Sequence, residues 1–127
     1  MNEMIKNLRN DTEKAQKYFA KELAFTLGPV ELKRLSEENE VKIIDVRLRS
    51  DYEVGHIPMA ISMPYEEIEN RINELNTEDL HVVYCYNPYC HLASKAAYML
   101  AEKNIPVMEL CGGFSVWSED FRYAVVQ

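Results

Sequence analysis

Short apolar segments rich in β-branched residues alternate with helical segments through most of this chain, and this alternation constrains the fold more than any other feature. Apolar runs of this kind, bounded by turn residues, predict buried strands. The predicted strands are 41–45, 60–63, 81–84 and 106–110. The predicted helices are 29–35, 68–75 and 92–103. Strands that alternate with helices are typical of an α/β domain, so we expect a mostly parallel central sheet flanked by helices.

The remaining segments complete the predicted domain. Segment 51–58 contains Gly55 and Pro58 and predicts a loop, whereas segment 114–121 predicts a closing helical turn around Trp117. The 127 residues suit one domain. Because the formal net charge is −7, we expect neither nucleic acid nor an anionic membrane as a partner. The sequence shows no apolar signal-peptide core and only three cysteines, so we expect a cytoplasmic protein without a disulfide framework.

The first 23 residues lack glycine and proline and predict an amphipathic helix appended to the domain, which would span 24–127. Its stripe recurs at steps of three or four and comprises Ile5, Leu8, Thr12, Ala15, Phe19 and Leu23. A stripe of this kind favours packing against the helix's own domain. The alternative is a seam for a partner or for a homodimer.

Three chemically reactive or charged side chains lie at the carboxyl ends of predicted strands: Asp45, Cys85 and Cys111. Ligands of open parallel sheets bind beyond the carboxyl ends of the strands, so this edge is the candidate site. Cys85 begins a loop that leads into a helix. Converging backbone N–H groups and the helix amino terminus favour a thiolate there, which is the nucleophilic form. The alternative is an inert buried cysteine.

Several blocks of the chain, in order, resemble the rhodanese-like family. They are Asp45-Val46-Arg47, the segment from Asp51-Tyr52 to Gly55-His56-Ile57-Pro58, the segment Val83-Tyr84-Cys85, Ser94-Lys95-Ala96-Ala97, and Gly112-Gly113 with Trp117. The resemblance implies an α/β fold and a persulfide sulfur on Cys85. It also implies structural roles near the site for Asp45 and Arg47 as a pair, and for His56 as the tie of its loop.

The loop after Cys85 departs from the family pattern. Its members are Tyr86, Asn87, Pro88, Tyr89, Cys90 and His91, and none is Arg, Lys or Gly. Thiosulfate is a dianion that family enzymes bind with basic loop residues, so we expect poor use of thiosulfate. His91 stands where related phosphatases need arginine, which argues against phosphatase chemistry. Met59 also replaces a usual glycine.

Cys90 and Cys111 are candidate partners for Cys85. Either thiol could attack a persulfide on Cys85 or resolve an oxidised form, and alternatively each is a small apolar contact. His91 could hold the thiolate or lie exposed, and Tyr86 and Tyr89 could wall a pocket or simply pack. The spacing of Cys85, Cys90 and His91 is not a standard zinc pattern, so we expect neither metal nor cofactor.

The leading hypothesis is a single-domain sulfurtransferase that carries sulfur on Cys85. Its donor would be polysulfide or a persulfide, and its acceptor a small-molecule or protein thiol. The alternative is a non-enzymatic module, which either senses redox state through a Cys85–Cys90 pair or docks to a partner protein.

Overall fold

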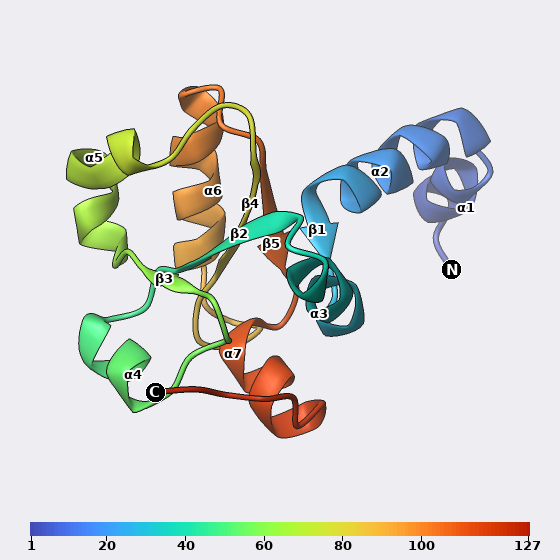
Figure 1. The fold of residues 1–127 in the computed structure, drawn as a ribbon. Coiled ribbons are helices and arrows are strands. Elements are labelled where there is room, and N and C mark those ends of the chain that lie inside the picture. Colours follow the sequence, from blue (N-terminus) through green and yellow to red (C-terminus); the bar gives the residue numbers. More distant parts are fainter.

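The computed structural model describes all residues from 1 to 127 and contains one five-stranded sheet (Figure 1). The strands run in the order β1-β5-β4-β2-β3, and every neighbouring pair is parallel. The strands are β1 (Thr26–Leu27), β2 (Val41–Asp45), β3 (Ile61–Ser62), β4 (Leu80–Tyr84) and β5 (Val107–Leu110). The expected parallel α/β architecture is therefore confirmed.

Seven α-helices accompany the sheet. They are α1 (Glu3–Arg9), α2 (Thr12–Phe25), α3 (Pro29–Glu37), α4 (Arg49–Val54), α5 (Ile68–Arg71), α6 (Leu92–Glu102) and α7 (Gly113–Ser115). Helices from α3 onward cover both faces of the sheet. Short 3₁₀ turns at Tyr65–Glu67 and Ile72–Glu74 flank α5, and a π-helical turn at Val116–Asp120 follows α7. No helix is both long and apolar enough to cross a membrane.

The alternation of side chains along β4 divides the core into two layers. Val83 and the following Cys85 belong to the cluster that packs beneath α5 and α6, with Ala93 and Ala96 of α6. Val82 and Tyr84 belong to the opposite cluster, which includes side chains of α3 and the segment after α7. Cys85 therefore lies on the α6 face of the sheet.

One local prediction was wrong, and one short strand was missed. Segment 51–58 was expected to be a loop, but its first half belongs to α4, which ends at the extended Gly55. Gly55 and Pro58 therefore follow the end of a short helix. The strand β1 was not predicted, because two residues are too few to show a periodic pattern of apolar side chains. Leu27 is nevertheless buried and accepts a hydrogen bond from the Cys111 amide at 2.9 Å.

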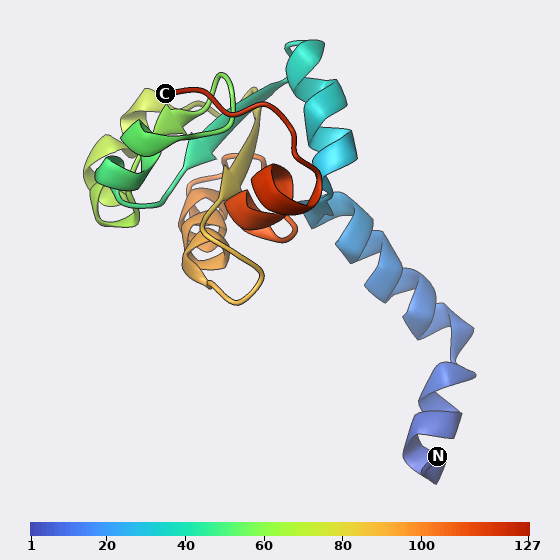
Figure 2. The same ribbon diagram turned by 90° about the horizontal axis from the view of Figure 1, so that it is seen from below.

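The amino-terminal segment forms two helices where one was predicted. The Asp11 side chain accepts a hydrogen bond from the Lys14 amide at 3.1 Å and so caps a second helix, which breaks the first at Asn10. No residue of α1 or α2 is buried, and both helices project away from the sheet (Figures 1 and 2). Packing of this stripe against its own domain is therefore wrong.

Met59 occupies a left-handed backbone conformation, with φ of 72°. Its side chain is exposed, so no packing compensates for the strain of roughly 1 kcal/mol expected of a non-glycine residue there. The usual glycine at this position therefore has a physical reason.

The turn after β5 touches the end of β4. Gly113 has φ of +67°, and an added Cβ would lie 2.9 Å from both the Cys85 oxygen and the Asn87 nitrogen. The next two amides donate to this same backbone: Phe114 to the Cys85 carbonyl and Ser115 to the Tyr86 carbonyl, each at 2.9 Å. The turn thus holds the start of the cysteine loop.

We expect Gly113→Ala to lower the free energy of unfolding by about 2–3 kcal/mol, because strain and backbone overlap add together. Gly28→Ala is the matched control, since Gly28 has φ of −95° and nothing within 4 Å of an added Cβ. Its effect should stay within about 0.5 kcal/mol. Urea unfolding followed by circular dichroism measures both, and equal losses would contradict this account of the turn.

Candidate active site

Cys85 follows β4 directly and is 3% exposed. Its thiol donates a hydrogen bond to the Cys90 carbonyl at 3.4 Å. The backbone amides of Tyr86 and Ala93 also face the sulfur and stabilise its thiolate form. Ala93 lies in the first turn of α6, so strand, loop and helix amino terminus all contribute to the environment of this thiol.

The loop curls because Asn87 and Pro88 build a tight turn. The Asn87 side chain accepts from the Tyr89 amide at 2.9 Å, and its carbonyl accepts from the Cys90 amide at 3.2 Å. Proline suits the second position of such a turn because its φ is preset. The turn returns the chain toward β4 and brings Cys90 against the cluster that contains Cys85.

The two thiols influence each other's protonation. Burial, and to a lesser extent the neighbouring Cys90 thiol, raise the pKa of the Cys85 thiol to about 11. Partial burial opposes the Cys90 thiolate, but the Cys85 thiol and the amides of Leu92 and Tyr86 outweigh it and lower the pKa of Cys90. The pair therefore releases one proton readily and retains the second.

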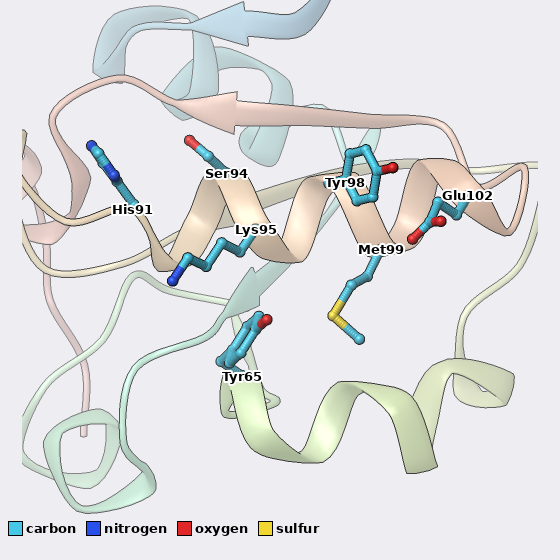
Figure 3. A pocket seen from close by; sticks show the side chains of 7 residues that line it. All are labelled: Tyr65, His91, Ser94, Lys95, Tyr98, Met99 and Glu102. Carbon is cyan, nitrogen blue, oxygen red and sulfur yellow. The ribbon is translucent and has the colours of Figure 1, made fainter.

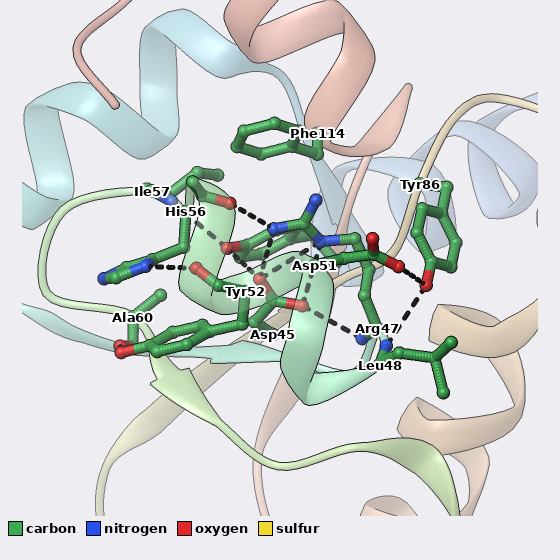
Figure 4. A network of polar contacts seen from close by, with 12 residues as sticks. Asp45, Arg47, Leu48, Asp51, Tyr52, His56, Ile57, Ala60, Tyr86 and Phe114 are labelled. Atoms are coloured by element: carbon green, nitrogen blue, oxygen red, sulfur yellow. Dashed lines mark hydrogen bonds and ion pairs between the residues drawn. The ribbon is translucent and has the colours of Figure 1, made fainter. Parts of the chain in front are cut away.

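A buried ion pair underlies this edge of the sheet (Figure 4). Asp45 is fully buried and contacts Arg47 Nη2 through its Oδ2 at 2.8 Å. The Tyr84 hydroxyl donates to the same oxygen at 2.6 Å. Arg47 also donates to the Gly55 carbonyl at 2.6 Å, and its guanidinium lies 4.0 Å from the centre of the Phe114 ring. The network therefore joins β2, β4, α4 and α7.

His56 and Tyr86 make side-chain contacts that connect neighbouring segments. The His56 ring stacks on Tyr52, and its Nδ1 contacts the Tyr52 carbonyl at 2.8 Å. Tyr86 reaches from the cysteine loop to α4, where its hydroxyl donates to Asp51 and accepts from the Leu48 amide. It also lines a cavity of about 390 Å³ with Arg47 and Phe114.

Three other predicted site residues are exposed. Cys111 is exposed beyond β5, and it is not among the groups that influence the Cys85 thiol. His91 precedes α6 and is exposed, and its side chain makes no capping hydrogen bond. Tyr89 is 89% exposed. All three cysteines are free thiols.

A groove of about 620 Å³ runs along α6 from the end of the cysteine loop (Figure 3). It is lined by Tyr65, His91, Ser94, Lys95, Tyr98, Met99 and Glu102. Sequence reasoning missed this groove, although Lys95 and Met99 stand one turn apart on the helix, and that spacing was the available signal. No group of three or more His, Cys, Asp or Glu residues is arranged to hold a metal ion.

The fold is a parallel α/β domain in which a buried cysteine follows the central strand β4. The sequence model of the rhodanese-like domain family matches residues 28–120, which is most of the chain. The chain belongs to the rhodanese-like domain family.

Named relatives include both enzymes and regulators. The chain is 37% identical over 87 residues to the HTH-type transcriptional regulator Rv0324 of Mycobacterium tuberculosis, covering 68% of this chain but only 38% of the regulator. It is 31% identical over 90 residues to the thiosulfate sulfurtransferase GlpE of Shewanella oneidensis, covering 70% of this chain and 87% of that enzyme.

The fold matches solved structures over nearly the whole chain. The BH2092 protein of Bacillus halodurans superposes with a TM-score of 0.85 and is 29% identical, and the match covers 91% of this chain and 86% of that protein. The match therefore extends into the projecting amino-terminal segment.

We expect Arg47→Met to lower the free energy of unfolding by about 3–5 kcal/mol, because it leaves the buried Asp45 carboxylate unpaired. Arg49→Met is the matched control two residues away. Its ion pair with Glu67 is exposed, with side chains 46% and 36% accessible, and should contribute about 1 kcal/mol or less. Chemical denaturation measures both. Similar losses would show that the buried ion pair contributes no more to the free energy of unfolding than the exposed one.

We expect Cys90→Ser to make the Cys85 thiol more acidic. The substitution removes a neighbouring negative charge, and a second thiolate then forms more easily, so the pKa of Cys85 falls below about 11. The pH dependence of alkylation at Cys85, followed by mass spectrometry in a Cys111→Ser background, should shift to lower pH. An unchanged profile would mean that the two thiols do not interact.

Proposed function

We propose that this protein is a sulfurtransferase that carries sulfane sulfur as a persulfide on Cys85. The observation that carries the proposal is the buried Cys85 sulfur at the end of β4, faced by the amides of Tyr86 and Ala93. These amides favour negative charge at the sulfur, both on the attacking thiolate and on the terminal atom of a persulfide. The sulfurtransferase name of the relative in Shewanella supports the same class of reaction.

Cys90 acts as the proton acceptor for Cys85 in this proposal. Its pKa is lowered, so it is the thiol of the pair that is ionised first, while Cys85 keeps its proton. When a donor arrives, the Cys85 proton passes to the Cys90 thiolate and the Cys85 sulfur attacks the outer sulfur of the donor. The donor loses one sulfur atom and leaves with the electron pair of the broken S–S bond. An acceptor thiolate then attacks the outer persulfide sulfur and releases the Cys85 thiolate.

Polysulfide or a persulfide suits this site better than thiosulfate. The loop contains no Lys or Arg, and the Arg47 guanidinium is occupied by Asp45. A missing charge-assisted hydrogen bond is worth about 1.5–3 kcal/mol, which is tenfold or more in binding. Polysulfide attack needs no sulfonate clamp, because its charge resides on polarisable sulfur. The acceptor is a thiol of a small molecule or of a protein.

The packing of Cys90 against the cluster that contains Cys85 favours a second function, which is redox sensing. A Cys90 thiolate that attacks the inner sulfur of a Cys85 persulfide forms a Cys85–Cys90 disulfide and expels hydrosulfide. Both thiols are then oxidised and the sulfane sulfur is reduced. The regulator in Mycobacterium tuberculosis that shares this domain supports a regulatory reading, and a docking role for the domain belongs to the same alternative.

Treatment of the reduced protein with polysulfide should add one sulfur atom, which an added thiol removes. Intact-mass spectrometry with peptide mapping measures this gain, which we expect on Cys85. Thiosulfate at the same concentration should react at least about tenfold more slowly, because the cationic clamp is absent.

Matched cysteine variants separate the two functions. Cys111→Ser should behave like the parent, whereas Cys85→Ser should gain no transferable sulfur. If Cys85→Ser retained full transfer, the proposal would fail. A loss of two hydrogens mapped to Cys85 and Cys90 would favour sensing, and no change with either donor would favour docking. Cys90→Arg restores a cation and should improve the use of thiosulfate, and Cys90→Ser should not.

A further inference from the structure

The side chain of Tyr86, the residue directly after Cys85, is held at its hydroxyl group more than by packing. The ring is partly exposed and belongs to neither core cluster. It lines the cavity of about 390 Å³ that Arg47 and Phe114 also border. A ring with few buried apolar contacts is weakly fixed by packing, so its position depends on its polar contacts.

The Tyr86 hydroxyl binds two groups at the start of α4 (Figure 4). It donates to the Asp51 carboxylate and accepts from the Leu48 amide at 3.2 Å. Leu48 is the N-cap residue of α4, and its carbonyl accepts from the Asp51 amide at 3.0 Å, so both anchors belong to one helical turn. The Asp51 carboxylate forms no ion pair, and Tyr86 is its only hydrogen-bond donor.

The backbone of Tyr86 carries an amide that faces both sulfur atoms of the thiol pair. This amide lowers the pKa of Cys90 and opposes the rise in the pKa of Cys85. The Phe114 amide holds the oxygen of the same peptide group, and the Ser115 amide holds the Tyr86 carbonyl, each at 2.9 Å. Tyr86 is therefore restrained through its backbone by the turn after β5 and through its side chain by α4.

We propose that Tyr86 is a positioning residue whose hydroxyl bond to Asp51 keeps its own backbone amide directed at the Cys85 sulfur. An amide hydrogen bond stabilises a thiolate, and it weakens steeply when its alignment is lost. Anchoring the cysteine loop to α4 therefore makes the thiolate easier to form. The role of Tyr86 in sulfur transfer rests on the proposed function, whereas its effect on thiol ionisation does not.

The Tyr86 hydroxyl keeps its proton while the thiols ionise. Burial and the hydrogen bond to Asp51 raise the pKa of this hydroxyl above its usual value near 10, whereas the pKa of Cys90 is lowered. The donor to Asp51 is therefore present over the whole range in which the first thiol of the pair titrates. Tyr86 consequently holds the loop without exchanging protons with the thiols.

The pH dependence of alkylation at Cys85 and Cys90, followed by mass spectrometry of the full chain in a Cys111→Ser background, tests this inference. Tyr86→Phe should shift the profile upward by about half a pH unit or more, which is about threefold less thiolate below the transition. Tyr18→Phe is the matched control, since it removes the hydroxyl of a 59% exposed tyrosine of α2 and should leave the profile unchanged. An unchanged profile in Tyr86→Phe would overturn the inference, and so would an equal shift in the control.

Variants of Asp51 separate the tether from the charge. Loss of a negative charge can only favour a nearby thiolate, so a pure charge effect would shift the profile to lower pH. Asp51→Ala breaks the tether and should instead shift the profile upward, as Tyr86→Phe does. Asp51→Asn keeps a hydrogen-bonding side chain and should lie closer to the parent than to Asp51→Ala. A downward shift in Asp51→Ala, or equal upward shifts in both variants, would contradict the tether.

Sulfur uptake from polysulfide separates a failure of this inference from a failure of the proposed function. Tyr86→Phe should gain sulfur about threefold more slowly than the parent at neutral pH, and the difference should vanish above the alkylation transition. Equal rates at neutral pH would show that the tether does not serve the transfer. A parent that gains no sulfur would refute the proposed function, and the alkylation profiles would still decide whether Tyr86 positions its amide.

Discussion

The Asp45 carboxylate is fully buried, and the arrangement of the candidate site follows from how it is satisfied. It binds Arg47 by two hydrogen-bonding nitrogens and accepts from the Tyr84 hydroxyl on the neighbouring strand. A buried charge of this kind is tolerated only when its partners have good geometry. Arg47 in turn fixes the Gly55 carbonyl and packs under the Phe114 ring, whose own amide holds the Cys85 carbonyl. One ion pair thus links the end of β2 to the backbone of the cysteine loop.

The features that sequence reasoning predicted well are those with a repeated physical signal. β-Branched runs predicted β2 and β4 because those strands are long enough to be buried on both faces. The break between α1 and α2 depends on one capping residue, Asp11, and β1 has only two residues. Neither feature therefore produces a repeating pattern of apolar residues in the sequence. The choice between Cys90 and Cys111 as the neighbour of Cys85 was open for the same reason. It depends on the tight turn at Asn87, which no pattern of hydrophobicity records.

Because the cysteine loop has no cationic side chain, its backbone amides must stabilise negative charge at Cys85. Family enzymes use basic loop residues, whereas here amides and a neighbouring thiol are the groups that influence the charge at Cys85. Amides stabilise negative charge on sulfur without selecting the shape of a particular anion. The second thiol adds something that a cation cannot, because it can accept a proton and can also form a covalent bond with sulfur. The loop therefore offers a second thiol beside Cys85 and no cationic side chain.

The carboxyl end of α2 and the cysteine loop both lie next to α6. The amino terminus of α6 faces the Cys85 sulfur through the Ala93 amide, while the later turns of the same helix line both surface grooves. A helix fixed by the core on one side through Ala96 and Leu100 cannot shift in only one of these places. Any partner that packs on Ala97 and Ala101 therefore also restrains the helix terminus beside the nucleophile. This coupling arises because α6 is rigid and contributes both to the environment of the thiol and to the surface grooves. It requires no contact between the partner and the thiol.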